Sequence, residues 1–219
     1  MKLISIDNRL KEIASLIDNC KSFADIGTDH GYLPIYLIQT NKAEYGYACD
    51  VAKMPLNSAR ENISKYNLDN KISTILSDGL KKVPKVDVVI MAGMGGNLIV
   101  DILKNAKLKY DTYILQPNIN VSYVREYLTN NNYMIIDEKI TFTHKKFYEI
   151  LKVVKGNQPL TDLQIKYGPI NLKNKSQIFI DKYTKILHKY ESILSDFKGN
   201  EDDKNKIINE INELKNILN

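Results

Sequence analysis

The chain has 219 residues, of which 43% are hydrophobic and 26% charged, and its formal net charge is +5. This balance is typical of a folded globular protein and excludes collagen-like and linker-like chains. No stretch approaches the roughly 18 apolar residues that a membrane helix needs, and two cysteines exclude a disulfide scaffold. The chain also shows no apolar leader with a cleavage site, so we expect a cytoplasmic protein with no membrane partner.

From residue 7 onward, helix-like and strand-like patterns alternate along the chain. Asp7 is placed to cap a first helix, in which Leu10, Ile13, Leu16 and Ile17 recur at helical spacing. Further helices are predicted at Tyr32–Gln39, Leu56–Tyr66, Asn97–Leu103 and Val121–Leu128. Strands are predicted at Ser22–Ile26, Tyr45–Cys49, Ile72–Leu76, Val86–Met91, Thr112–Leu115, Tyr133–Ile140 and Phe147–Val154.

This order of elements predicts an α/β fold with a doubly wound sheet. Strands that alternate with helices are typical of parallel sheets, and the nearly uniform apolar run Val86–Met91 suits a central strand buried on both faces. The last two strands are joined by Thr141–Lys146, which leaves no room for a crossover helix. They are therefore expected to form an antiparallel hairpin, which completes a seven-stranded Rossmann-like sheet.

The pattern changes after Gly156-Asn157-Gln158-Pro159, and we place a domain boundary between residues 1–155 and 156–219. Two sets of apolar residues then follow at alternating spacings of three and four: Phe179, Tyr183, Ile186, Tyr190, Ile193 and Phe197, then Ile207, Ile211, Leu214 and Leu218. Such seams predict an antiparallel coiled-coil hairpin, whose first helix has about 22 residues. Gly199 is expected to cap the first helix and Asn200 to begin the second.

The stretch from Asp25 to Pro34 joins the first strand to the next helix and carries two glycines. Gly27 allows a tight turn, and Gly31 lets the backbone approach a ligand closely. A dinucleotide-binding loop would have a glycine where this chain has Asp29. Carboxylates beside the glycines would repel a pyrophosphate but suit a cation. We therefore expect a positively charged amino acid group rather than a phosphate.

Two further aspartates stand at the ends of the second and third predicted strands. Asp50 lies 19 residues after Gly31, the usual place for a carboxylate that binds both ribose hydroxyls. Asp78 can accept a hydrogen bond from an adenine amino group. Acids at the ends of three successive strands, together with the glycine loop, indicate a site for S-adenosylmethionine.

Five motifs together resemble a known family. They are Asp25-Ile-Gly-Thr-Asp-His-Gly-Tyr-Leu-Pro34, Cys49-Asp50-Val51, Ser77-Asp78-Gly79-Leu80, Met91-Ala-Gly-Met-Gly-Gly96 and Gln116-Pro117-Asn118. In combination they resemble the bacterial tRNA (adenine(22)-N1)-methyltransferases, the TrmK family, from about residue 2 to the C-terminus. The resemblance implies a class I methyltransferase fold, with S-adenosylmethionine donating a methyl group to N1 of an adenosine in the tRNA D-arm.

The candidate site residues follow from these motifs. The expected cofactor-binding residues are Asp25, Gly27, Asp29, His30, Gly31, Tyr32, Asp50, Val51, Asp78, Gly79, Leu80, Ala92, Gly93 and Met94. The expected catalytic residues are Asp29, Gln116 and Asn118, and no metal site is expected. Because N1 of adenine has a free lone pair, no general base is needed, and catalysis can rest on alignment and a dry site.

Two other functions stay open on the sequence alone. A small-molecule methyltransferase would share the cofactor motifs without needing the helical hairpin, and a non-catalytic S-adenosylmethionine-binding protein would use the hairpin for assembly. The hairpin could grip tRNA or serve only as a folding device. The basic net charge permits a nucleic-acid partner. A monomer is compatible with the sequence, which does not fix the oligomeric state.

Overall fold

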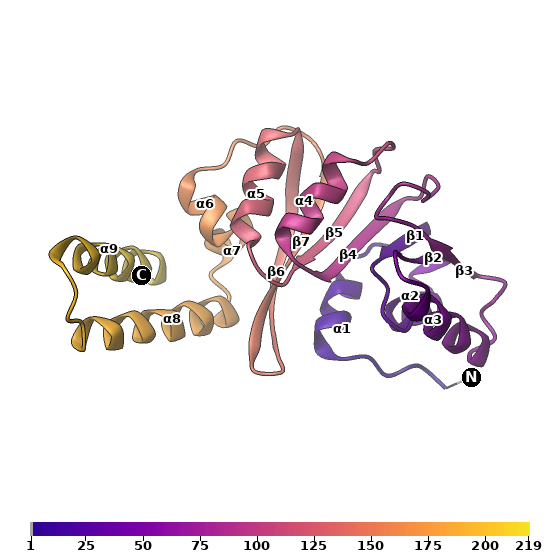
Figure 1. Cartoon of the computed structure of the whole chain (residues 1–219), viewed down its shortest axis with the longest axis horizontal. Coiled ribbons are helices and arrows are strands. Elements are labelled where there is room, and N and C mark those ends of the chain that lie inside the picture. The colour runs from indigo at the N-terminus through magenta and orange to yellow at the C-terminus, as the bar shows by residue number, and fades with distance from the viewer. Residues whose placement is uncertain (1) are drawn as a thin grey trace. The chain divides into compact units, whose positions relative to one another are not determined.

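The computed structural model describes residues 2–219 and divides the chain into two compact units. The first unit ends at Pro169 and the second spans Ile170–Asn219. The helices of the first unit are α1 (Asn8–Ser15), α2 (Tyr32–Gln39), α3 (Lys53–Lys65), α4 (Gly96–Lys104), α5 (Val121–Asn130) and α6 (Asp162–Tyr167), and α7 (Pro169–Asn174) follows (Figure 1). Among residues 2–219, no helix is long and apolar enough to cross a membrane.

The first unit contains one seven-stranded sheet. Its strands are β1 (Cys20–Ile26), β2 (Ala43–Asp50), β3 (Ile72–Leu76), β4 (Val88–Met94), β5 (Thr112–Pro117), β6 (Tyr133–Thr143) and β7 (Lys146–Lys155). They lie in the order β3-β2-β1-β4-β5-β7-β6, and β1 to β5 run parallel. β7 is antiparallel to both β5 and β6, so the predicted terminal hairpin is confirmed. The strand order reverses between β1 and β4, which is where open α/β sheets bind ligands.

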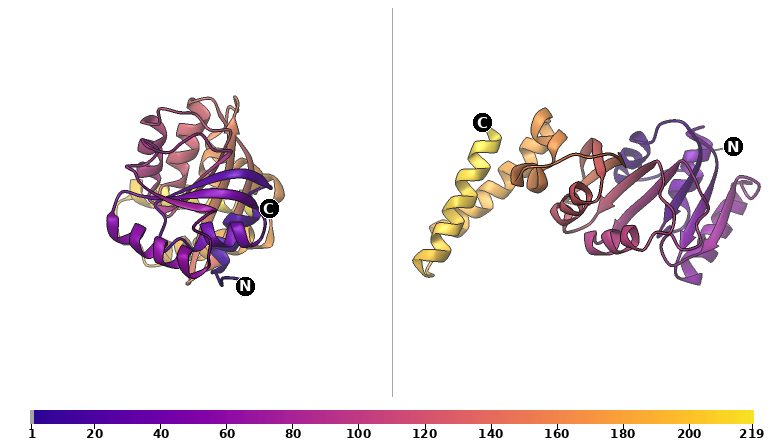
Figure 2. Two further views of the ribbon diagram at one scale, coloured as in Figure 1. Left: turned by 90° about the vertical axis from the view of Figure 1, so that its right-hand side faces the viewer. Right: turned by 90° about the horizontal axis from the view of Figure 1, so that it is seen from above.

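Both faces of the sheet are buried. Val88 and Ile90 of β4 belong to a core cluster that also includes Ile13 of α1 and Ile35 of α2. Val89 and Met91, which point to the opposite face because side chains alternate along a strand, have no exposed surface either. Helices α4 and α5 contact β4, β5 and β6 on that second face, and the views in Figure 2 show the sheet between its helices. The apolar run of β4 therefore predicted its burial correctly.

The hairpin between β6 and β7 is longer than predicted and turns within two residues. The last pair of the ladder is Thr143 with Lys146. The two residues between them, His144 and Lys145, have φ angles of 48° and 62°. Two successive left-handed residues form the type of turn that matches the twist of a hairpin. Most of the expected connecting segment, residues 141–146, is thus part of the strands.

Helix α6 extends the first unit beyond the boundary expected after Lys155. Thr161 caps this helix, and Gln164 bonds back to the Thr161 main chain, which makes a capping box. The connecting segment is tied to the sheet because Ile135 N donates to Gln158 Oε1 at 2.8 Å. The buried Arg125 guanidinium of α5 also donates to the carbonyl of Ile165 at 3.4 Å. These bonds explain why the compact unit ends at Pro169 rather than at the change in composition.

The second unit is a helical hairpin of α8 (Gln177–Ser195) and α9 (Glu201–Leu218). α8 has 19 residues, and Asp196 rather than Gly199 is its C-cap, so the expected cap was wrong by three positions. Asn200 caps α9 as predicted, since its side chain accepts from Asp203 N. Leu187 is buried, whereas Ile193 of the predicted seam is 41% exposed. The seam therefore drifts away from the ideal heptad positions along α8.

Candidate functional site

The loop between β1 and α2 is shaped by two glycines. Gly27 and Gly31 have φ angles of 76° and 69°, which side chains other than glycine rarely adopt. A Cβ on Gly31 would approach Cβ of Ala59 to 3.3 Å, so α3 packs directly on the loop. The main-chain N–H groups of Gly27 and Thr28 both donate to the carbonyl of Cys49, at 2.8 and 2.9 Å. These bonds fix the loop to the carboxyl end of β2.

A cavity of about 320 Å³ opens beside this loop. It is lined by Asp7, Arg9, Leu10, Asp25, Gly27, Asp29, Tyr32, Leu33, Ala92 and Gly93. Six of these residues were expected at the cofactor site from the sequence, and they come from the loop after β1 and the end of β4. Three carboxylates and one guanidinium share the lining. That mixture suits a zwitterionic amino acid group better than a phosphate.

Asp25 is the buried acid of the cavity, whereas Asp7 is half-buried and Asp29 is exposed. Its residue is 6% exposed at the end of β1. Burial raises the pKa of the Asp25 carboxyl to about 6, while the Thr28 side chain and the positive charge of Arg9 act in the opposite direction. A carboxylate that is buried in this way fits a cationic ligand, which would offset the cost of its charge.

Arg9 connects the first helix to the ends of β4 and β5. Its Nη1 donates to Oε1 of Gln116 at 2.6 Å, and the same oxygen accepts from Gly93 N at 3.1 Å. Gln116 Nε2 donates to Asn118 Oδ1 at 3.1 Å, and Asn118 Nδ2 donates to the Gly93 carbonyl at 2.6 Å. Gly93 has a φ of 80° and lies at an irregularity in the ladder between Ala92 and Met94. The network therefore holds a bulge open beside the cavity.

Gln116 and Asn118 differ in their access to a ligand. Gln116 has no exposed surface, whereas Asn118 is exposed. Gln116 is thus confined to bonds with its protein neighbours, whereas solvent reaches the Asn118 side chain. Both were expected as catalytic residues from the sequence, and the structure brings the two side chains together.

Asp50 lies at the end of β2 with one of its oxygens already engaged. Its Oδ1 accepts from Ala52 N at 2.7 Å, which orients the carboxylate. Its carbonyl accepts from Ser77 N at 2.9 Å, so the ends of β2 and β3 are joined. Val51 follows with 69% of its surface exposed. An oriented acid beside an exposed apolar side chain suits a ribose with its attached base.

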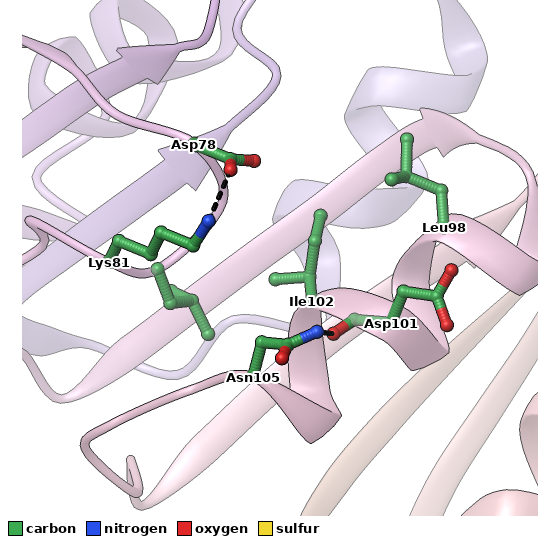
Figure 3. Close-up of a pocket in the computed structure, with 7 residues that line it drawn as sticks. Asp78, Lys81, Leu98, Asp101, Ile102 and Asn105 are labelled. Carbon is green, nitrogen blue, oxygen red and sulfur yellow. Dashed lines mark hydrogen bonds and ion pairs between the residues drawn. The ribbon is translucent and has the colours of Figure 1, made fainter.

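A second, smaller pocket lies between the loop after β3 and helix α4 (Figure 3). It measures about 90 Å³ and is lined by Asp78, Leu80, Lys81, Leu98, Asp101, Ile102 and Asn105. Asp78 Oδ2 pairs with Lys81 Nζ at 2.5 Å. Gly79 has a φ of 54°, and a Cβ there would approach Ile102 to 3.0 Å. The expected motif Asp78-Gly79-Leu80 therefore borders a partly apolar recess, but not the larger cavity.

His30 lies outside the cavity lining. Its ring stacks on Tyr32, with centroids 5.3 Å apart, and its Nε2 lies 3.2 Å from Asp29 Oδ1. Gly31, in a left-handed conformation, is the N-cap residue of α2, and no side chain caps that helix. His30 therefore does not cap α2, and its ring lies over the expected cofactor residue Tyr32.

Arg9 and Asp7 line the cavity but were not expected there. The sequence indicated Asp7 only as a helix cap, and it does cap α1, since Oδ1 accepts from Leu10 N at 2.8 Å. A signal for Arg9 exists in the composition, because only three of the 31 basic residues are arginines. Among residues 2–219, no group of three or more His, Cys, Asp or Glu side chains is arranged to hold a metal ion.

The fold and the site together define a class of enzyme. A mostly parallel sheet with an antiparallel β7, a glycine loop after β1 and acids ending β1 and β2 are the features of a class I S-adenosylmethionine-dependent methyltransferase. The chain belongs to the TrmK family, whose model, described as tRNA (adenine(22)-N(1))-methyltransferase, matches residues 23–216.

Similar proteins agree with this membership. A Bacillus subtilis (strain 168) protein named tRNA (adenine(22)-N(1))-methyltransferase is 35% identical over 204 residues, which cover 88% of this chain and 86% of that protein. The crystal structure of the B. subtilis m1A22 tRNA methyltransferase TrmK has a TM-score of 0.84 and 31% identity, with 100% of both chains covered. M. capricolum TrmK, solved in complex with S-adenosyl-homocysteine, has a TM-score of 0.86 and 34% identity, with 99% of this chain and 98% of that chain covered.

Proposed function

We propose that this chain methylates N1 of adenosine 22 in tRNA and uses S-adenosylmethionine as the methyl donor. Family membership over residues 23–216 supports the reaction and the substrate. The observation on this chain that carries the proposal is the cavity beside the Gly93 bulge, where acids, one arginine and an amide network meet at the carboxyl edge of the sheet. When bound there, S-adenosylmethionine supplies an electrophilic methyl group on a positively charged sulfur.

The charges of the cavity suggest how the amino acid end of the donor is held. Asp25 and Asp29 would face its ammonium group, and Arg9, the only basic residue of the lining, would face its carboxylate. Asp25 has the stronger effect of the two acids because it is buried, whereas the Asp29 side chain is 82% exposed.

The nucleoside end of the donor matches the ends of β2 and β3. Asp50, with one oxygen fixed by Ala52 N, keeps its second oxygen for the ribose hydroxyls. Asp78 would accept from the adenine amino group, while Val51 and Leu98 present exposed apolar surface to a flat base. Asp78 pairs with Lys81 through Oδ2 only, so its Oδ1 stays available for this contact.

The acceptor base would enter beside Gly93 and Asn118. The sequence after β4 lacks the Asn/Asp-Pro-Pro-aromatic tetrapeptide with which exocyclic adenine methyltransferases grip the amino group. Methylation of N1 needs no proton removal before attack, so the chain has to align the base and exclude water. The two hydrogen bonds of Asn118 to Gln116 and Gly93 would orient its amide for that alignment.

A pair of tRNA transcripts tests the proposal. The full chain is incubated with S-adenosylmethionine labelled in its methyl group and with unmodified tRNA that carries either adenosine or guanosine at position 22. We expect label in the first transcript and none in the second. Equal labelling of both transcripts, or labelling of neither, would reject the proposed function.

A further inference from the structure

The β6–β7 hairpin extends past the sheet at the same edge as the site. β5 pairs with β7 only from Leu151 to Val154, whereas the β6–β7 ladder continues to the pair Thr143 with Lys146. Because β7 is antiparallel to β5 and Leu151 lies opposite Leu115, the residues of β7 before Glu149 run beyond Pro117, the carboxyl end of β5. Figure 1 shows this two-stranded ribbon reaching past the other strands. We call residues 139–148 the ribbon and His144, Lys145 and Lys146 its basic turn.

Two contacts place the ribbon beside the cavity. Nε2 of His144 lies 3.6 Å from Oδ2 of Asp7, which lines the cavity. Further down the ribbon, the guanidinium of Arg9 lies 5.7 Å from the centre of the Tyr148 ring. The basic turn is therefore at the rim of the cavity, within reach of a nucleotide next to a base bound inside it.

The charge of the ribbon has one sign. Residues 139–148 contain three lysines and no aspartate or glutamate, a formal charge of +3. Lys139 pairs with Glu12 at 3.0 Å, but no acid among residues 2–219 pairs with Lys145 or Lys146, and both lysines are exposed. The Asp7 carboxylate, which contacts the turn, is engaged by Leu10 N and His144. An exposed, unpaired lysine pair at a substrate rim fits a phosphate backbone.

The backbone conformation of the turn also supports a role for its side chains. Turns with two left-handed residues strongly favour Asn-Gly, yet this chain has His144 and Lys145 there, at φ angles of 48° and 62°. A left-handed conformation is unfavourable for a lysine such as Lys145. The turn keeps a backbone conformation that Asn-Gly would adopt with less strain. This suggests that the side chains present there have a role of their own.

We propose that the basic turn binds phosphates of the tRNA strand on either side of the target adenosine. The inference rests on the proposed function, because it names the surface of the same site that holds the RNA. Lys145 and Lys146 neutralise two phosphates, and His144 directs the turn toward the rim through its contact with Asp7. Phosphate contacts of this kind position the strand without reading its sequence.

The salt dependence of tRNA binding tests the proposal on the full chain. In the test variant, Lys145→Gly and Lys146→Ser remove both charges, and glycine suits the left-handed turn. In the matched control, Lys21→Ser and Lys71→Ser remove two exposed lysines at the opposite, amino edge of the sheet. Binding of unmodified tRNA is measured over a series of KCl concentrations, together with S-adenosylmethionine affinity and Tm.

For the test variant we expect the slope of log affinity against log salt to fall in magnitude by about 1.4–1.8, since each phosphate contributes about 0.7–0.9. Affinity for tRNA should fall about tenfold near 0.1 M salt, while cofactor affinity stays within twofold and Tm does not decrease. The control variant should keep the slope and the affinity of the parent. A slope and affinity equal to those of the parent, or an equal loss in the control, would overturn the proposal.

Methylation of adenosine 22 by the parent chain separates this outcome from a failure of the proposed function. A parent that methylates adenosine 22 while the test variant keeps its slope overturns only the role of the basic turn. A parent that neither binds nor methylates tRNA overturns both proposals. Replacing both lysines by arginine, which keeps the charges, should preserve the slope and separates loss of charge from damage to the turn.

Discussion

Replacing Asp25 by asparagine removes a buried ionisable group from the cavity and keeps its size. Burial raises the pKa of this carboxyl to about 6 from an ordinary value of 3.8. That gap corresponds to about 3 kcal/mol of preference for the neutral form in the folded state. Because the folded pKa lies above the unfolded one, ionisation costs stability. The cost is absent below the unfolded pKa, grows as the pH rises from about 4 to 6, and is complete above 6.

Thermal unfolding at several pH values measures this cost. About 2.4 kcal/mol of this cost develops between pH 4 and pH 7.5. The Tm of Asp25→Asn minus that of the parent should therefore increase by roughly 5–10 °C over that interval, at about 2–4 °C per kcal/mol for a chain of this size. Asp29→Asn is the matched control for the substitution itself, because it makes the same change at an acid of the same loop whose side chain is 82% exposed. A Tm difference for Asp25→Asn that does not change with pH would refute the reasoning from burial.

Cofactor binding should show the opposite preference for charge. A cationic ligand favours ionised Asp25, so the affinity of the parent for S-adenosylmethionine should fall as the pH drops below about 6. Asp25→Asn should bind more weakly at pH 7.5 and show no such fall. Calorimetric titration at pH 5 and pH 7.5 checks both points, and parallel pH profiles for the two proteins would remove Asp25 from the cofactor site.

Three further predictions follow from the site and the unit boundary. Asp50→Ala removes a charged hydrogen-bond partner that contributes about 1.5–3 kcal/mol, so cofactor affinity should fall by roughly ten- to a hundredfold in calorimetry; unchanged affinity in a folded variant would contradict the ribose role. Asp29→Asn should weaken cofactor binding and sharply reduce turnover, and parental turnover at saturating substrates would exclude that role. A chain ending at residue 155 loses the hydrogen bonds that Gln158 and Ile165 make with the rest of the first unit. Its Tm should therefore be lower than that of a chain ending at residue 169. Equal Tm values would contradict this account of the boundary.

Local pattern was sufficient to predict most of the fold. Periodicity predicted that side chains on both faces of β4 are buried, and it predicted the bounds of the helix Tyr32–Gln39. Capping chemistry predicted Asp7 at the start of α1. The structure has all three features. Helix α6 was missed although Thr161 and Gln164 are spaced for a capping box, because only six residues follow the cap. The two-residue turn at His144 was also missed, since neither residue type normally signals a left-handed turn.

The site was predictable where the chemistry depends on strand ends and not where it depends on distant contacts. Asp25 and Gly93 lie at the carboxyl ends of β1 and β4, and Gly27 directly follows β1, so their meeting at one edge of the sheet could be deduced from the order of elements. The approach of Arg9 to Gln116 joins residues 107 positions apart, and no local pattern encodes it. The raised pKa of Asp25 could not be predicted from the sequence either, because it depends on how deeply the packed structure buries the carboxyl.

Identification of the methylated nucleoside tests the central claim most directly. Unmodified tRNA is treated with the full chain and S-adenosylmethionine, digested to nucleosides and analysed by mass spectrometry against standards, and the modified position is located in fragments of the same tRNA. We predict 1-methyladenosine, at position 22. The appearance of N6-methyladenosine, of a methylated base other than adenine, or of 1-methyladenosine at another position would contradict the account.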